Sequence, residues 1–201
     1  MKIIVIGATG TIGAAVATAL AARKHEVVRA SRKGEVKVDI EDRASIRALF
    51  AAVRGADAVI CCAGGAVFKP FAQLTDADYE VGLNSKLMGQ VALARIAAEH
   101  LSDGGSITLT TGVLATRPMP GSAAISLVNA ALEGFVRAAA LELPRRLRVN
   151  AVSPPWVKET MVKLGMDPSP GLAAADVAKA YVAAVEGTMQ GEIIAAKKFG
   201  G

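Results

Sequence analysis

Hydrophobic positions along the chain alternate between two patterns. Short runs rich in β-branched residues predict seven strands, at Lys2–Ile6, Glu26–Ala30, Glu35–Val38, Ala58–Cys61, Ser106–Thr110, Arg148–Val152 and Glu192–Ala195. Longer alanine-rich stretches with apolar residues three and four apart predict helices at Thr11–Arg23, Asp42–Val53, Asp76–Leu101, Ser122–Leu143 and Ala173–Val185. Asp42, Asp76 and Ser122 are residue types that cap helix N-termini. This alternation predicts a single α/β domain over residues 1–201, with a Rossmann-type doubly wound parallel sheet between two helical layers.

Composition narrows the possible functions. The chain is 52% hydrophobic and 20% charged, which is typical of a globular protein, and no apolar run reaches membrane-spanning length. Its N-terminal apolar run soon turns into a glycine loop, so neither a signal peptide nor membrane association is expected, and the protein is expected to be cytoplasmic. The net charge of +5 comes from dispersed Lys and Arg, and aromatic residues make up only 4%, so nucleic-acid binding is not expected.

The two cysteines and one irregular segment say less about function. Cys61 and Cys62 are adjacent, a spacing that suits neither a stabilising disulfide nor a zinc site, so reduced core thiols and no metal site are expected. The Pro- and Gly-rich segment Ser153–Gly171 follows a strand, and in open α/β sheets that edge binds ligands. It is interpreted either as a substrate lid or as a surface connection.

The stretch "IIVIGATGTIGAAVATAL" reads as a strand, a tight loop and a helix, with glycines at Gly7, Gly10 and Gly13. Glycines let backbone amides approach a pyrophosphate, and the helix N-terminus adds partial positive charge. This context predicts a nucleotide site, to which Thr9, Thr11 and Ile12 also belong; the alternative is a tight turn without a ligand.

The end of the second predicted strand indicates which dinucleotide binds. An NAD site usually has an acidic residue there for the ribose hydroxyls, but this chain has Ser31, Arg32 and Lys33. A guanidinium can bind a 2′-phosphate, so NADP(H) is the expected cofactor, although the two cations would equally suit a solvated turn. Asp39, next to Ile40 in "VDI", is expected either to accept a hydrogen bond from the adenine amino group or to cap the next helix.

Over nearly its whole length the chain resembles the short-chain dehydrogenase/reductase family. The resemblance rests on "GATGTIG", "VDI", "CCAGG", "PGSAAISLVNAALEGFVRAAALEL", "RVNAVSPP" and "GEIIAAKKFGG". It implies that Cys62, Ala63 and Gly64 line the adenine ribose, that Ile40 belongs to the cofactor site, and that Pro154 and Val157 face the nicotinamide. Pro155 stands where the family has a glycine, which removes a backbone amide donor.

The same resemblance implies altered catalytic residues. Typical members use a tyrosine and, four residues later on one helix face, a lysine; Ile125 and Asn129 occupy these positions here. Gly112 aligns with the usual serine, and the neighbouring Thr111 is a candidate hydroxyl for the substrate oxygen. Lys86 aligns with the usual asparagine and is a candidate to stabilise an oxyanion or donate a proton; the alternative is that it faces water or binds the cofactor ribose.

These observations favour an atypical NADP(H)-binding oxidoreductase that reduces or oxidises an unidentified small molecule, with Lys86, Thr111 and Asn129 as candidate catalytic residues. The alternative is a catalytically inactive NADP(H)-binding regulator or redox sensor. A purely structural oligomer would leave the glycine loop unexplained. The resemblance also implies a homodimer or homotetramer formed through the fourth and fifth helices, and the small residues of "NAALEGFVRAAALEL" permit close helix packing.

Overall fold

The computed structural model describes residues 1–200 and is built on one parallel sheet of seven strands, in the order β3-β2-β1-β4-β5-β6-β7. The strands are β1 (Lys2–Ile6), β2 (Glu26–Ser31), β3 (Val36–Lys37), β4 (Ala58–Cys61), β5 (Ser106–Thr110), β6 (Arg148–Ser153) and β7 (Ile193–Ala195). The chain reverses its winding direction between β1 and β4, which are adjacent in the sheet. The predicted Rossmann-type doubly wound sheet is therefore confirmed, with each strand within two residues of its expected bounds.

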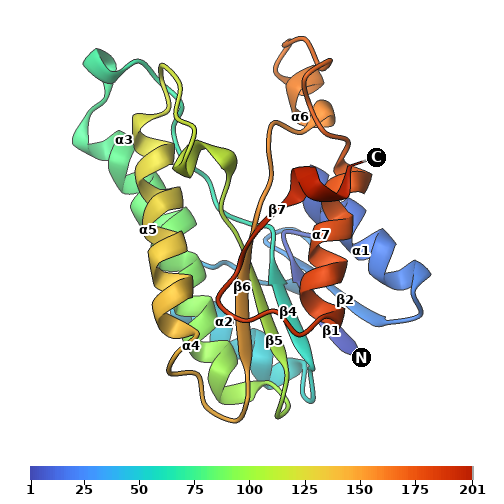
Figure 1. Ribbon diagram of the computed structural model, residues 1–201. Helices are drawn as coiled ribbons and strands as arrows, with labels where there is room; N and C mark the ends of the chain where they lie inside the picture. The colour runs from blue at the N-terminus through green and yellow to red at the C-terminus, as the bar shows by residue number, and fades with distance from the viewer. Residues whose placement is uncertain (201) are drawn as a thin grey trace.

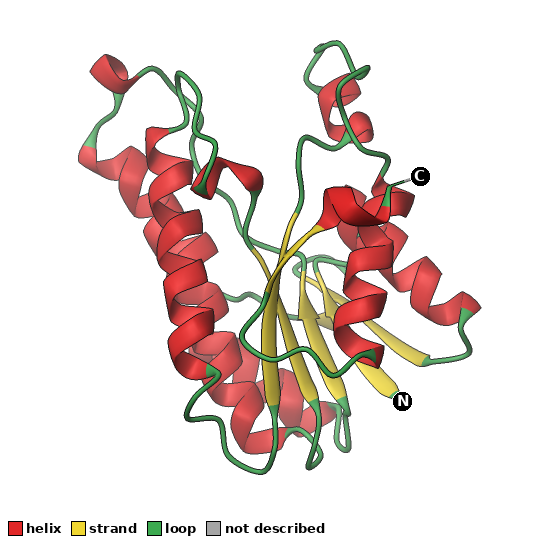
Figure 2. Cartoon of the chain, in the orientation of Figure 1, coloured by secondary structure: helices red, strands yellow, loops and turns green. Residues whose placement is uncertain are grey.

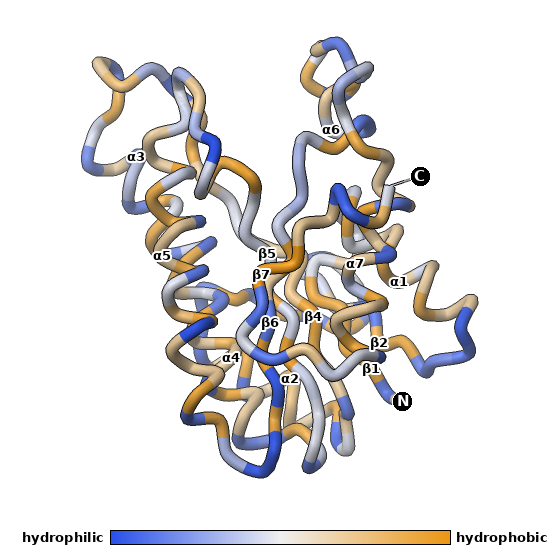
Figure 3. The backbone as a smooth tube through the Cα atoms, viewed as in Figure 1, coloured by the Kyte–Doolittle hydropathy of each residue, from blue (hydrophilic) through white to orange (hydrophobic). Residues whose placement is uncertain are grey.

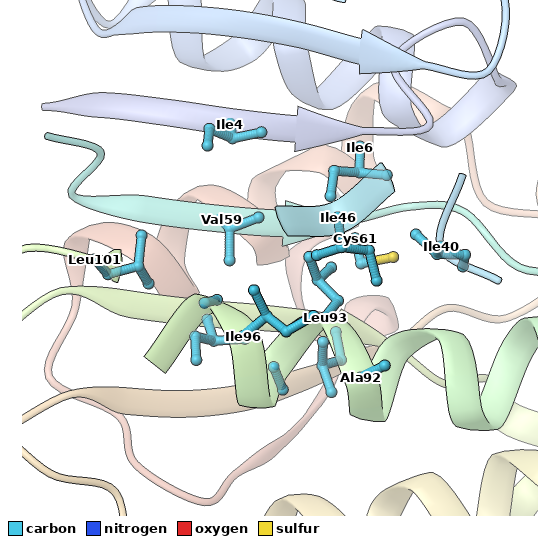
Figure 4. Packing of buried hydrophobic residues seen from close by; sticks show 14 of the residues in the cluster. Ile4, Ile6, Ile40, Ile46, Val59, Cys61, Ala92, Leu93, Ile96 and Leu101 are labelled. Carbon is cyan, nitrogen blue, oxygen red and sulfur yellow. The ribbon is translucent and has the colours of Figure 1, made fainter. Parts of the chain in front are cut away.

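Helices cover both faces of the sheet, because successive side chains of a buried strand point to opposite sides. In β1, Ile3 and Val5 pack with α1 (Thr11–Ala22) and α7 (Ala174–Glu186). Ile4 and Ile6 instead face the layer made by three other helices, shown in Figures 1 and 4. These are α2 (Arg43–Ala52), α4 (Gln90–His100) and α5 (Ala123–Ala139). The two hydrophobic cores thus hold the sheet between its helical layers.

The expected helix Asp76–Leu101 is not continuous. It divides into α3 (Asp76–Val81), a π-helical segment η2 (Gly82–Gly89) and α4. A Cβ on Gly82 would lie 3.2 Å from Val128 Cγ1, and one on Gly89 would lie 2.9 Å from Ile40 Cγ1, so both glycines pack tightly. A short π segment keeps the direction of the helix, so the spacing of apolar residues did not reveal it.

The helix ends also differ from the sequence prediction. Asp42 caps α2 by accepting the amide of Ala44, as expected. Asp76 does not cap α3, because Thr75 precedes it and forms a capping box with Asp78. Ser122 precedes α5 but makes no capping bond, since its hydroxyl donates to the Met119 carbonyl at 2.7 Å.

Two further corrections concern helix extents. Helix α5 ends at Ala139 rather than Leu143, ahead of Pro144, which disfavours helix in the residue before it. The irregular segment Ser153–Gly171 contains a short helix, α6 (Lys158–Lys163). Figure 2 shows α6 and several loops at the end of the sheet where the strands finish. Among residues 1–200, no helix is long and apolar enough to span a membrane.

Candidate active site

The turn between β1 and α1 is as tight as its glycines predict. Gly7 has a φ of 79°, and a Cβ there would lie 2.9 Å from the carbonyl carbon of Cys62. A Cβ on Gly13 would lie 2.1 Å from the Gly7 oxygen, so α1 packs directly against the turn. Gly10 precedes α1 without a side-chain cap, and the first turn holds no acidic residue. The amides of this helix start therefore remain available to an anion.

A first cavity of about 400 Å³ opens beside this turn, at the carboxyl ends of β1, β2 and β4. Eleven of the residues expected to bind the cofactor line it: Gly7, Thr9, Gly10, Ser31, Arg32, Lys33, Asp39, Ile40, Cys62, Ala63 and Gly64. Ile6, Val38, Glu41, Gly65 and Ser85, which the sequence analysis did not select, complete its wall. The switch point of the sheet thus carries the cavity that its topology predicts.

Five expected cofactor residues lie outside this wall: Ile12, Pro154 and Val157 line a second cavity, described below, and Thr11 and Gly13 line neither of the two. The Thr11 hydroxyl accepts a hydrogen bond from Lys163 Nζ at 2.8 Å, which ties α1 to α6. Gly13 lies beneath the turn and serves its packing.

One end of the first cavity is suited to an anion. Ser31 is 6% exposed, and its hydroxyl oxygen has no hydrogen-bond partner among the described residues. Arg32 and Lys33 are exposed beside it and make no ion pair with any residue from 1 to 200. Asp39 accepts the Glu41 amide at 3.0 Å and does not cap α2. An unsatisfied hydroxyl next to two unpaired cations suits a phosphate group.

A second cavity, of about 310 Å³, shares Gly64 with the first. It gathers all three candidate catalytic residues: Lys86, Thr111 and Asn129. The rest of its wall is mostly apolar and comprises Ile12, Gly112, Val113, Leu114, Ile125, Pro154, Pro155, Trp156, Val157 and Thr160. Lys86 is the one ionisable side chain in this wall.

Lys86 is buried and does not face water. It is 7% exposed, and its Nζ donates to the carbonyl oxygen of Thr110 at 3.1 Å. Burial lowers the pKa of Lys86 from 10.5 to about 8. Gly64 has a φ of 126° and lies so close that a Cβ on it would meet Lys86 Cα at 3.0 Å. Asn84, two residues earlier, is exposed, so the two residues lie on different faces.

Thr111 and Asn129 connect the end of β5 to α5. The Thr111 hydroxyl lies 3.1 Å from the Asn129 carbonyl oxygen and 3.2 Å from Glu133 Oε1, so its proton is committed to buried acceptors. The Asn129 side chain is 1% exposed, and its Oδ1 has no partner among the described residues. Asn129 therefore has unused hydrogen-bonding capacity in the wall.

Residues 7–193 match the family described as Enoyl-(Acyl carrier protein) reductase. The chain belongs to the short-chain dehydrogenase/reductase family. An uncharacterized oxidoreductase of Methylorubrum extorquens is 31% identical over 178 residues, covering 77% of this chain and 72% of that protein. Hydroxynaphthalene reductase-like protein Arp2 of Metarhizium brunneum is 36% identical over 137 residues, covering 65% of this chain and 51% of that protein. The chain thus spans about half the length of that curated relative.

Solved structures are similar over almost the entire chain. The protein lin1944 from Listeria innocua is 38% identical with a TM-score of 0.91, covering 97% of this chain and 98% of that one. A small-chain dehydrogenase in complex with NADPH is 28% identical with a TM-score of 0.85, covering 97% of this chain and 95% of that one. The family and its fold are therefore shown for this protein.

Some wall residues of this short-chain dehydrogenase/reductase were not selected from sequence. Trp156, the single tryptophan, lines the second cavity and meets the Phe68 ring edge-on, with ring centroids 6.0 Å apart. Thr160 of α6 lines the same cavity, which places part of the segment Ser153–Gly171 at the ligand edge. A single tryptophan within a Pro-rich segment was the feature of the sequence that could have indicated this part of the wall.

Of three further polar groups near the site, Tyr181 and Cys61 line neither cavity, whereas Cys62 lines the first. Tyr181 is fully buried, and its hydroxyl lies 2.7 Å from Thr110 Oγ1, so it packs in the core. Cys61 is buried and its pKa is raised to about 11 by that burial. Cys62 lines the first cavity, and burial raises its pKa as well. Both thiols are therefore protonated at neutral pH.

Proposed function

We propose that this protein is an NADP(H)-dependent oxidoreductase that transfers a hydride between the nicotinamide and a small molecule. The observation that carries the proposal is the pair of cavities that meet at Gly64, one suited to a nucleotide and one mostly apolar with a single ionisable wall residue. The NADPH complex of a family member with the same fold supports the choice of cofactor.

The residues present fit NADP(H). The Gly7–Gly13 turn and the amides of α1 would hold the pyrophosphate, and the unpartnered Ser31 hydroxyl with Arg32 and Lys33 would hold the 2′-phosphate. Cys62, Ala63 and Gly64 would line the adenine ribose, and the nicotinamide would lie toward Pro154 and Val157 in the second cavity. When bound, the reduced nicotinamide supplies a hydride, and the protein must provide the proton.

Lys86 is the proposed proton donor. By the family resemblance, Ile125 and Asn129 occupy the positions of the usual tyrosine and lysine, and isoleucine has no proton to give. With its pKa lowered to about 8, the Lys86 ammonium is still charged at neutral pH but releases its proton more readily than an exposed lysine. Asn129 would orient the substrate oxygen, Ile125 would keep water out, and the Thr111 hydroxyl would hold the α5 backbone in place.

The cofactor assignment is tested by titrating the protein with NADPH and NADH. NADPH is expected to bind at least about tenfold more tightly, because a charge-assisted hydrogen bond contributes about 1.5–3 kcal/mol. Arg32→Ala should remove most of that preference, and Arg54→Ala, which changes an exposed arginine far from the cavity, should leave it intact. Equal binding of the two cofactors by the unaltered protein would overturn the assignment.

A catalytically inactive regulator or redox sensor is the competing function. One observation favours it: the second cavity has no Tyr, His, Asp or Glu in its wall. Oxidation of NADPH is therefore measured across quinones, imines, conjugated alkenes and carbonyl compounds. The enzyme proposal expects turnover with at least one class and a loss of about 100-fold or more in Lys86→Met, the usual scale of general acid catalysis. Tight NADPH binding without turnover on any class would establish the regulator instead.

A further inference from the structure

A third cavity, of about 510 Å³, lies next to the second one and has a different chemical character. The two share Val113 and Pro155 as wall residues. The third cavity also contains three cationic side chains, Arg117, Lys197 and Lys198, and no acidic residue. It is therefore a positively charged annex to the apolar pocket beside Lys86.

The three cations come from separate parts of the chain. Arg117 follows the turn η3 (Val113–Ala115), at the carboxyl end of β5, and the two lysines lie in η4 (Ala196–Phe199), directly after β7. Figure 3 shows a hydrophilic segment between β7 and the C-terminus, where the two lysines of η4 lie. Two connections at the ligand edge of the sheet thus bring positive charge to one cavity.

These cations are not neutralised by the described part of the protein. Arg117, Lys197 and Lys198 are exposed and make no ion pair with any residue from 1 to 200. The acidic groups of the neighbouring segment are otherwise engaged. Glu159 accepts the Ala174 amide, and Asp167 accepts the amide and hydroxyl of Ser169. Like charges held together without counter-charges favour an anionic ligand.

We propose that the substrate carries an oxyanionic group, a carboxylate or a phosphate, that binds Arg117, Lys197 and Lys198 while its reducible part occupies the second cavity. This inference rests on the proposed oxidoreductase function and specifies its substrate class. Guanidinium and ammonium groups bind carboxylates and phosphates through charge-assisted hydrogen bonds. Val113 and Pro155 belong to both walls, so the two cavities are adjacent, and the proposed substrate would reach from the apolar pocket into the cationic one.

The test uses Trp156 as an intrinsic reporter, because it is the single tryptophan and lines the second cavity. The protein is first saturated with NADP⁺, so that the first cavity cannot take up the probes. Fluorescence is then titrated with hydrocinnamate, benzyl phosphate and the neutral hydrocinnamamide. At least one anionic probe is expected to bind about tenfold or more tightly than the amide, and the stronger of the two identifies the oxyanion.

Variants separate this site from general surface charge. Arg117→Gln/Lys197→Gln/Lys198→Gln should weaken the preferred anion about tenfold or more and leave amide binding within about twofold. Lys24→Gln/Arg54→Gln/Arg146→Gln removes three exposed cations elsewhere and should leave both affinities unchanged. Lys198→Gln alone gives a smaller loss of the same kind and serves if the triple variant does not fold.

Two results would overturn the proposal. One is equal affinity of the anions and the amide in the unaltered protein, and the other is an equal loss in the control variant. Light scattering on the same samples shows whether the three cations control assembly instead, and dissociation of an oligomer in the triple variant would also count against a substrate site. Failure of NADP⁺ to bind would contradict the proposed function alone, because Arg117, Lys197 and Lys198 do not line the first cavity and the triple variant still separates the two sites in titrations without NADP⁺.

Discussion

Among single residues, Lys86 couples the site to the stability of the fold. Burial lowers its pKa from 10.5 to about 8. Below pH 8 the folded state therefore buries a charged ammonium group, which destabilises it. Between these two values the unfolded chain binds more protons than the folded one. The free energy of unfolding therefore rises with pH across this window.

This gives a prediction for Lys86→Met, which keeps the length of the side chain without its charge. From about pH 7 to about pH 9, the free energy of unfolding of the unaltered protein should gain on the order of 1 kcal/mol relative to the variant. Urea denaturation at several pH values measures it, with the exposed Lys24→Met as control. A parallel pH dependence in Lys86→Met and the unaltered protein would show that Lys86 is not desolvated.

Two glycines of the same turn should respond very differently to a methyl group. A Cβ on Gly13 would lie 2.1 Å from the Gly7 oxygen, whereas one on Gly10 would lie 3.3 Å from it. Gly13→Ala should therefore destabilise the fold by about 1–3 kcal/mol or more, and Gly10→Ala by less than about 1 kcal/mol. Thermal or urea unfolding of the two variants gives the comparison. Similar losses of unfolding free energy in the two variants would mean that Gly13 packs less tightly against Gly7 than these distances indicate.

Between elements, one carboxylate holds the C-terminal ends of α1 and α7 together. Glu186 pairs with Arg23 at 2.5 Å and with His25 at 2.9 Å. Hydrogen bonds from Arg23 and His25 lower the pKa of Glu186 from 4.5 to about 2. Because the folded pKa is lower, this stabilisation is complete above about pH 4.5 and is lost as pH falls toward 2.

Glu186→Gln should therefore be less stable than the unaltered protein at neutral pH. The difference should shrink as pH is lowered from about 4.5, because the unaltered protein loses its ion pairs by protonation. Urea midpoints across this range measure the effect. Glu99→Gln, which breaks an exposed pair with Arg47 at 3.4 Å, should cause little change at any pH. A constant gap between Glu186→Gln and the unaltered protein would rule out this titration.

The strands could be predicted because buried parallel strands are short, continuous β-branched runs, as in Lys2–Ile6. The glycine turn could be predicted because a tight turn between a strand and a helix requires glycines at particular nearby positions, which can be read from the sequence. The burial of Lys86 could not be predicted, because it depends on the π-helical segment and on the contact with Gly64. Neither feature follows from a regular spacing of apolar residues along the sequence. The cationic cavity was missed for a similar reason, since Arg117 and Lys197 are distant in sequence.

For the whole molecule, the exposed face of α5 is a candidate contact surface. The outer face of α5 carries mostly small or apolar side chains at helical spacing. The exposed residues of the helix are Leu127, Ala130, Ala131, Gly134, Arg137 and Ala138, and the exposed Leu141 follows it. We propose that this α5 face packs against a second copy of the chain, as the family resemblance implies. Small side chains let two helices approach closely, which a solvent-facing helix does not require.

The α5 face gives the prediction at the largest scale. The unaltered protein should be a dimer or tetramer at micromolar concentration, and Ala131→Arg should shift it to monomer, because a charge at the centre of an apolar contact must be desolvated. Size-exclusion chromatography with light scattering measures the mass. Ala21→Arg places the same charge on an exposed position of α1, on the other side of the sheet, and should leave the oligomer intact. A monomeric unaltered protein, or dissociation by both variants alike, would show that α5 is a solvent-facing helix and that both cavities are complete within one chain.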